Sequence, residues 1–253
     1  MNEDIGHILD RWKYDRRRTV RKIVGKDGRQ RIQVRLELGL LQMELDGRPD
    51  GKRPYNKKSW LDYYELRAAR NEQKRGALGR FMLNHRDFLR LSEEGLLYYN
   101  RYVVLFQMGD YRRTERDTAR NVRMFDFVKK HAIDENDKLS LEQYRPYLIR
   151  MNRAAHALRR MKMKDYDGAL EEIDRAIRQI GALEDIDLPT AKIEKERSLG
   201  VLKEMFEKIY EERPPTEKEV LVNALDKAVA DERYEDAASI RDRLKELESM
   251  KLN

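Results

Sequence analysis

The sequence predicts a mainly α-helical protein: an irregular α-solenoid or helical bundle, with a small β-hairpin near the N-terminus and a helical hairpin at the C-terminus. Charged residues make up 40% of the 253 residues and hydrophobic residues another 40%, a composition typical of long helices with charged faces. Only 13 glycines and 6 prolines are present to interrupt such helices. From Ser59 onward, the apolar residues recur with helical spacing, whereas residues 19–38 alternate with the period of a strand.

The composition also excludes several classes of protein. The chain has no cysteine, which rules out disulfides, thiolate catalysis and cysteine-based zinc or iron–sulfur sites. The four histidines are far apart and lack metal-binding spacing, so we expect no catalytic residues, no metal and no cofactor. No apolar stretch approaches the roughly 20 residues that cross a bilayer, and the first residues are acidic rather than a signal region. We therefore expect a cytoplasmic, non-enzymatic protein that does not contact a membrane.

The positive charge is concentrated in a basic N-terminal region, residues 1–58. The chain carries a formal net charge of +7, but residues 11–60 hold 16 Lys and Arg against 6 Asp and Glu, a local charge of +10. Trp12, Tyr14 and Tyr55 lie among these cations, a mixture that suits phosphate attraction and base stacking. The candidate nucleic-acid-binding residues are Arg16, Arg17, Arg18, Arg21, Lys22, Arg29, Arg31, Arg35, Lys52 and Arg53. No recognition-helix motif is present, so such binding would be weak and independent of sequence; a solvated basic face is the alternative.

Residues 19–38 have the pattern of a β-hairpin around the turn at 25–28. Two registers are open. A two-residue loop would leave Val20 and Val24 on the arginine face, whereas a three-residue loop with Gly28 left-handed places them on the face of Ile32 and Val34. We favour the second register. Because an isolated hairpin is marginal in water, its apolar face must be covered by a helix, a third strand or another subunit.

The next segment, residues 39–45, is apolar enough to be buried, and a loop follows at 46–54. Two glycines and two prolines define turns in this loop, and its three cations could meet an anionic ligand. It lacks the spacing of a P-loop or of a dinucleotide-binding loop. A structural turn is the favoured interpretation.

Residues 59–212 form the expected helical body. Turn signals predict breaks at 76–79, 91–92, 109–110, 131–140, 164–165 and 181–189. Ser92 and Ser140 are plausible capping residues near two of the helix starts.

Three turns share one local form, in which a tyrosine follows a polar turn and precedes a small residue by three positions. The tyrosines are Tyr111, Tyr166 and Tyr234, and the small residues are Thr114, Ala169 and Ala237. We expect the tyrosine to wedge into the helix corner, while the small side chain lets two helices approach closely.

The middle turn has further apolar positions at matching spacing: Ala157, Ala176, Ile173 and Ile177. Together with Tyr166 and Ala169, these resemble half of a tetratricopeptide-type repeat. The three turns are 55 and 68 residues apart, so a regular repeat is not predicted.

The clearest boundary is Arg213-Pro214-Pro215, because proline disfavours helix at the residue before it, and Thr216 can cap the helix that follows. A module at residues 216–250 then begins with an apolar helix and turns at 231–233. Its second half has an aromatic-Glu pair, two alanines, a hydrophobic-Arg-Asp triplet and a closing hydrophobic-x-x-Leu. These positions are Tyr234, Glu235, Ala237, Ala238, Ile240, Arg241, Asp242, Leu244 and Leu247.

This pattern resembles the UVR (UvrB/UvrC) motif. The resemblance implies a small helical hairpin that binds another such hairpin, as in nucleotide-excision-repair subunits, Clp-type chaperone ATPases and activators of arginine kinases. Two short helices also bury too little surface alone, which favours self-pairing or docking on a partner. We expect Ala238 to be buried where the two helices meet. The candidate protein-binding residues are Leu221, Leu225, Tyr234, Ala238, Arg241, Asp242 and Leu244.

The sequence therefore predicts a non-enzymatic adaptor or regulatory protein that binds a partner protein, or a second copy, through this C-terminal hairpin. The alternative is a nucleic-acid-binding protein that uses the basic N-terminal region. DNA repair is one process in which such a protein could act.

Overall fold

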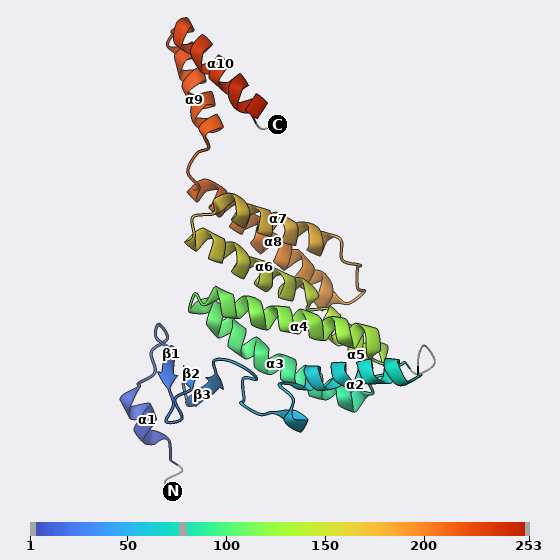
Figure 1. Cartoon of the computed structure of the whole chain (residues 1–253). Coiled ribbons are helices and arrows are strands. Elements are labelled where there is room, and N and C mark those ends of the chain that lie inside the picture. Colours follow the sequence, from blue (N-terminus) through green and yellow to red (C-terminus); the bar gives the residue numbers. More distant parts are fainter. Residues whose placement is uncertain (1–3, 76–79, 251–253) are drawn as a thin grey trace. The chain divides into compact units, whose positions relative to one another are not determined.

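A computed structural model covers the chain and describes residues 4–75 and 80–250. The expected break at 76–79 lies outside these residues. The chain divides into two compact units, Met1–Glu207 and Lys208–Asn253. The basic N-terminal region belongs to the first unit, together with most of the helical body (Figure 1).

The first unit begins with a short helix, α1 (Gly6–Arg11), and a three-stranded antiparallel sheet in the order β1-β2-β3. Its strands are β1 (Val20–Val24), β2 (Gln30–Leu36) and β3 (Gly39–Glu44). The sequence pattern predicts only the first two as a hairpin. The apolar segment after them returns along β2 as the third strand.

The favoured hairpin register is confirmed. Val20 lies opposite Val34, and Lys22 lies opposite Ile32. The turn has the expected three-residue loop, because the Gly28 N–H donates to the Gly25 carbonyl at 3.0 Å and Gly28 has a φ of +75°.

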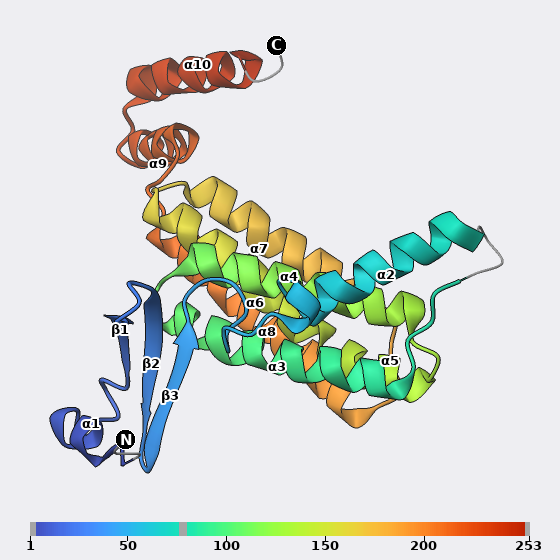
Figure 2. The same cartoon turned by 60° about the horizontal axis from the view of Figure 1, so that its bottom comes forward.

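One face of the sheet packs on the C-terminal end of α3 (His85–Gln107) (Figure 2). Ile32 of β2 and Met43 of β3 form a buried cluster with Leu45 and with Val104 and Leu105 of the helix. A third strand and a helix therefore both support the hairpin, as its small size requires.

The rest of the first unit is helical, and the helices stack in chain order (Figure 1): α3 packs on α4, α4 on α6, and α6 on α7. The bounds are η1 (Pro54–Asn56), α2 (Trp60–Arg75), α4 (Tyr111–His131), α5 (Glu135–Glu142), α6 (Arg145–Lys162), α7 (Tyr166–Gly181) and α8 (Pro189–Glu212). The last residues of α8 fall in the second unit. The likeness of α6 and α7 to a tetratricopeptide repeat stays a prediction, although Ala157, Ala169 and Ala176 are fully buried where such a repeat needs small residues.

The predicted break at Leu91–Ser92 is wrong, because α3 is one continuous helix there. The polar run after Ser92 resembles a helix start, but its Glu94 is fully buried and serves another helix. The Glu94 carboxylate accepts hydrogen bonds from the backbone N–H groups of Trp60 and Leu61 at 2.7 and 3.2 Å, and so caps α2. Ser140 likewise lies inside α5 rather than at a helix start.

The three tyrosine turns have one geometry. Each has a left-handed residue two positions before the tyrosine: Gly109, Lys164 and Glu232, with φ of +70°, +60° and +58°. In each, the next residue's N–H donates to the carbonyl five residues earlier, at 2.9, 3.0 and 2.8 Å, which closes the end of the preceding helix. The small residues that follow are all buried: Thr114, Ala169 and Ala237.

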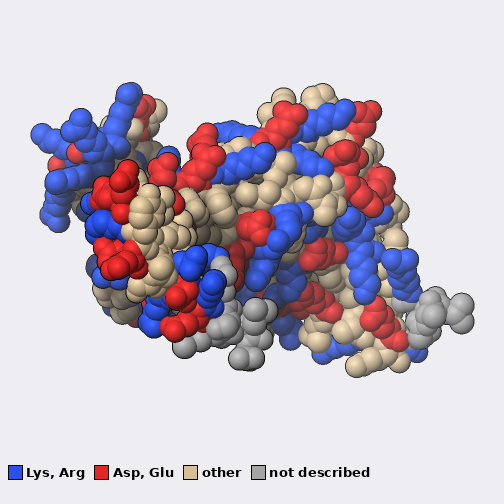
Figure 3. All heavy atoms as spheres, turned by 90° about the horizontal axis from the view of Figure 1, so that it is seen from above, with Lys and Arg blue, Asp and Glu red and all other residues tan. Residues whose placement is uncertain are grey.

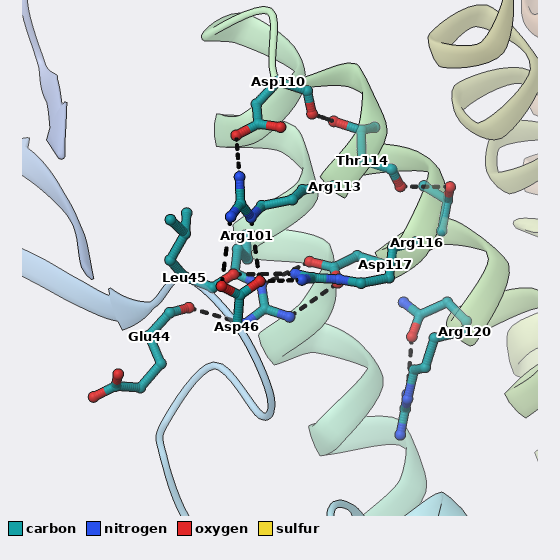
Figure 4. Close-up of polar contacts among 12 residues, drawn as sticks. Glu44, Leu45, Asp46, Arg101, Asp110, Arg113, Thr114, Arg116, Asp117 and Arg120 are labelled. Carbon is teal, nitrogen blue, oxygen red and sulfur yellow. Dashed lines mark hydrogen bonds and ion pairs between the residues drawn. The ribbon is translucent and has the colours of Figure 1, made fainter. Parts of the chain in front are cut away.

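A buried polar network joins the end of the sheet to α3 and α4 (Figure 4). The Arg101 guanidinium donates to both oxygens of Asp117, at 2.6 and 2.9 Å, and to the backbone carbonyl of Glu44 at 2.9 Å. Both side chains are at most 1% exposed. Arg113 and Arg116 of α4 converge on Asp46, just after β3. This network holds the loop after β3 against α4.

Candidate functional site

The second unit contains the helical hairpin, α9 (Glu217–Ala230) and α10 (Tyr234–Met250). The predicted cap at Thr216 is confirmed. Thr216 Oγ1 accepts from the Glu219 N–H at 3.2 Å, and the Glu219 carboxylate accepts from the Thr216 N–H at 2.8 Å, which completes a capping box. Arg213 donates to the same carboxylate at 2.8 Å. Chiefly because of this arginine, the pKa of Glu219 is lowered to about 2.

The hairpin has a very small core. Among the described side chains of α9 and α10, only Ala228 and Ala237 are buried. The leucines Leu221, Leu225 and Leu244 are only half-buried. The two helices therefore approach closely through alanine, but they leave most of their apolar surface incompletely covered.

Beside this contact lies an open groove of about 570 Å³. Leu225 and Val229 of α9 line it, together with Tyr234, Ala238 and Arg241 of α10. Val229 is 51% exposed and Tyr234 is 68% exposed, although both are large apolar side chains. A mainly apolar groove whose charged lining residues are one arginine, Arg241, and one aspartate, Asp226, is a surface suited to contact with another protein.

Four of the seven predicted protein-binding residues line this groove: Leu225, Tyr234, Ala238 and Arg241. Leu221 and Leu244 are half-buried in the hairpin, and Asp242 is exposed next to Arg241, with an Nε to Oδ1 distance of 3.8 Å. The expectation that Ala238 is buried between the helices is wrong, because the buried alanine is its neighbour Ala237. One residue on a helix turns the side chain by about 100°, so Ala238 faces the groove instead. Val229 was not among the candidates, although its spacing of four from Leu225 places both on one helix face.

The basic N-terminal region separates into cations that hold the fold and cations that are free. Arg21 bonds to Gln33 at 2.8 Å and lies over the Trp12 ring, and Lys22 pairs with Asp110 at 2.8 Å. The buried Arg35 donates to the backbone carbonyls of Trp12 and Gly39. These three predicted nucleic-acid-binding residues have partners within the chain.

Arg31 is held in the same way. It pairs with Asp27 at 2.6 Å and with Glu44 at 2.7 Å. The hydrogen bond from Arg31 is the main cause that lowers the pKa of Asp27 to about 2. Arg31 therefore fixes the hairpin turn to β3.

The other six predicted cations are exposed and form two groups. Arg16, Arg17 and Arg18 lie on the segment between α1 and β1, where Arg16 comes no closer than 3.9 Å to Glu37. Arg29, Lys52 and Arg53 line a cleft of about 1250 Å³, together with residues of α3 and α4. Elsewhere on the face seen in Figure 3, Lys and Arg alternate with Asp and Glu, as on an ordinary solvated surface.

The cleft also contains arginines that are not among the predicted nucleic-acid-binding residues. Arg116, Arg120 and Arg123 extend along one side of α4, and Arg48 lies in the loop before η1. The signal was present in the sequence, because a spacing of three or four places arginines on one helix face. Burial lowers the pKa of Arg120, whose guanidinium pairs with the carboxylate of Glu94.

Within the part of the chain that the structure describes, no group of three or more His, Asp or Glu side chains could hold a metal ion. No helix in the same residues is long and apolar enough to cross a membrane.

The family model of the UvrB/uvrC motif matches residues 216–249. The match begins at the capping threonine and spans α9, the turn and nearly all of α10. The resemblance noted in the sequence is thus confirmed, and the UVR motif is a protein-interaction motif. No curated protein and no solved structure matches the chain.

Proposed function

We propose that the protein is a non-enzymatic adaptor or regulatory protein, which binds a partner protein or a second copy of itself through the groove of the α9–α10 hairpin. The observation that carries this proposal is the open apolar groove on a UVR hairpin whose own core is two alanines. Complete burial of an exposed apolar side chain stabilises a complex by ~1.5–3 kcal/mol. Covering Val229 and Tyr234 therefore favours docking.

The groove also suits another helix as its occupant. The lining residues on α10 recur at intervals of three and four, from Tyr234 to Ala238 to Arg241, so they form a ridge along the helix. The alanine in this ridge is small, and a second helix can approach it closely. Arg241 and Asp226 both line the groove, so its charges favour a partner that carries residues of both signs.

The test compares the full chain with residues 1–212, which lack the hairpin. Sedimentation equilibrium measures self-association, and affinity capture with mass spectrometry finds other partners. We expect the full chain to associate and the shortened chain not to associate. Circular dichroism should show that the shortened chain is still folded and mainly helical. Equal association of both chains would refute the proposal.

Nucleic-acid binding by the basic N-terminal region is the second candidate function. It is favoured by the two exposed groups of cations, at 16–18 and in the cleft, where carboxylates of the described residues come no closer than 3.9 Å to Arg16 and to Arg29. We expect this binding to be electrostatic and to weaken steeply with salt. Fluorescence anisotropy with labelled oligonucleotides at about 50 mM salt tests it, and an absence of binding there would exclude it.

A further inference from the structure

The cleft beside α4 has an excess of positive charge that its own carboxylates do not neutralise. Nine Lys and Arg line it against four Asp and Glu. Each of the four acidic residues is already paired with an arginine. The pairs are Glu44–Arg31, Asp46–Arg113, Asp62–Arg123 and Asp117–Arg101.

The unpaired cations lie on the loop side of the cleft. Among the residues that the structure describes, the side chains of Lys52, Arg53 and Lys58 make no ion pair and no hydrogen bond, and all three are exposed. Arg29 comes no closer than 3.9 Å to Asp27, whose carboxylate Arg31 already holds. These four cations face a hollow of about 1250 Å³, which is large enough for several phosphate groups.

The segment that carries three of these cations also holds an exposed aromatic ring. Tyr55 is 67% exposed, and it stacks on Tyr63 with ring centroids 4.9 Å apart and an interplanar angle of 18°. The backbone at Tyr55 is left-handed, with φ of +46° and ψ of +41°, and Asn56 follows with φ of +57°. Such a conformation costs free energy for a bulky residue, and strain of this kind is concentrated at functional sites.

The supporting ring is itself fixed. Tyr63 lies on α2 and makes an edge contact with Trp60, at a centroid distance of 5.6 Å. Arg90 of α3 lies over the Trp60 ring at 4.8 Å. Tyr55 is therefore the exposed member of a packed aromatic cluster, although an exposed tyrosine with no ligand gains little from being held there.

We propose that this cleft binds single-stranded nucleic acid: Arg29, Lys52, Arg53 and Lys58 bind backbone phosphates, and Tyr55 stacks on a base. Exposed cations together with an exposed aromatic ring are the combination by which proteins bind single strands without reading sequence. Tyr55 does not line the cleft itself, but it follows the lining residue Arg53 by two positions. The inference rests on the second candidate function, and names its site and ligand.

Two comparisons favour a single strand over other polyanions. A base inside a duplex is stacked on both faces, so the Tyr55 ring would gain nothing from duplex DNA. An acidic polypeptide would meet the cations but has no base to place on the ring. Both alternatives are outcomes of the experiment below.

The experiment measures fluorescence anisotropy with the full chain and four probes: single-stranded DNA, single-stranded RNA, duplex DNA and poly-glutamate. Two triple variants form a matched pair, because each removes three exposed cations: Lys52→Ala with Arg53→Ala and Lys58→Ala, and Arg16→Ala with Arg17→Ala and Arg18→Ala. We expect the first to weaken single-strand binding by about tenfold or more at 50 mM salt, and to reduce the salt slope by up to ~2. The second group lies outside the cleft, so its removal should weaken single-strand binding several-fold less than removal of the first.

The aromatic contribution is tested at Tyr55. Tyr55→Leu should weaken single-strand binding by about fivefold or more and leave the salt slope unchanged, whereas Tyr55→Phe should bind like the wild type. Comparison of the single-stranded DNA and RNA probes then shows which nucleic acid is preferred. Melting temperatures equal to that of the wild type show that each variant is folded.

Several results would overturn the proposal. One is loss of binding in the Arg16–Arg18 variant with binding retained in the cleft variant, which would leave the second candidate function standing at another site. Wild-type affinity in Tyr55→Leu, or affinity for duplex DNA or poly-glutamate equal to that for a single strand, would exclude single-strand recognition. No binding of any oligonucleotide would refute both the inference and the second candidate function.

Discussion

The first unit and the C-terminal hairpin use the same turn but differ in what surrounds it. In the first unit, the small residues after the turns, Thr114 and Ala169, are fully buried and adjoin further helices. In the hairpin, Ala237 is buried where α10 packs on α9, and Tyr234 beside it is 68% exposed. The same local structure is thus complete within the first unit, while the hairpin leaves a groove that a partner can fill.

The first unit and the hairpin also differ in how deeply their charged pairs are buried. The first unit buries the charged pair Arg101–Asp117, and each side chain has its partner within the chain. The ion pairs of α10 lie in solvent, and in Arg241–Asp242 both side chains are more than 60% exposed. Exposed pairs contribute only ~0–1 kcal/mol. The first unit therefore specifies its own structure, whereas the hairpin keeps its charges available for a partner.

The largest effect expected is on the buried pair. Asp117→Ala leaves the Arg101 guanidinium buried without its carboxylate, so the free energy of unfolding of the first unit should fall by ~3–5 kcal/mol. Urea denaturation measures this change. As a control, Arg123→Ala removes an arginine that is 53% exposed, and should cost no more than ~1 kcal/mol. Equal effects of the two substitutions would show that the network does not hold the sheet to the helices.

The second prediction separates the core of the hairpin from its groove. Ala228→Asp places a carboxylate where the side chain is 1% exposed, and should destabilise the hairpin by ~2 kcal/mol or more while the first unit stays folded. Hydrogen exchange of α9 and α10 amides measures the local stability. Ala238→Asp, at an exposed position, should leave these amides protected. Loss of protection in both variants would mean that Ala238 belongs to the core.

The third prediction concerns the start of the hairpin at low pH. The pKa of Glu219 is about 2 in the folded chain, below its ordinary value of 4.5, chiefly because Arg213 bonds to the carboxylate. A lowered pKa stabilises the folded state at pH values above 4.5, and this stabilisation is lost as the pH falls toward 2. NMR signals of residues 216–220 should report fraying of α9 in that interval. Glu219→Gln should remove this pH dependence, and an unchanged profile would argue against the role of Glu219.

The smallest effects concern the left-handed residues of the shared turn. Glu232 has a φ of +58° where Gly109 occupies the equivalent position. Because glycine adopts this conformation without steric cost, Glu232→Gly should stabilise the hairpin by up to ~1 kcal/mol, and Gly109→Ala should destabilise the first unit by ~1 kcal/mol. Thermal unfolding measures both changes. If both substitutions raised, or both lowered, the melting temperature, the two turns would not be equivalent.

Local signals in the sequence predicted local structure well. Gly28 defined the hairpin register, Thr216 marked the start of α9, and the tyrosine turns marked helix starts at Tyr111, Tyr166 and Tyr234. The resemblance to the UVR motif rests on the residue pattern of a single hairpin: an aromatic-Glu pair, two alanines and a hydrophobic-Arg-Asp triplet. Each of these features depends on residues close together in the chain.

Features that depend on distant residues were missed. Glu94 resembles part of a helix start, and only its contact with the N-terminus of α2, more than 30 residues earlier, explains why it is buried within a continuous helix. The cleft likewise combines residues of the loop at 46–58 with arginines of α4. Period and turn signals contain no information about such pairings, so the cleft could be found only in the structure.

The central claim is that the groove of the hairpin binds a protein partner, and the most direct measurement is quantitative affinity capture with three full-length chains: wild type, Ala238→Asp and Ser239→Asp. Both substitutions add a carboxylate at an exposed position of α10, but only Ala238 lines the groove. We expect a partner, or a second copy with a different tag, to be captured with the wild type and with Ser239→Asp, and to be reduced at least about tenfold with Ala238→Asp. Equal capture by Ala238→Asp and the wild type would contradict the claim.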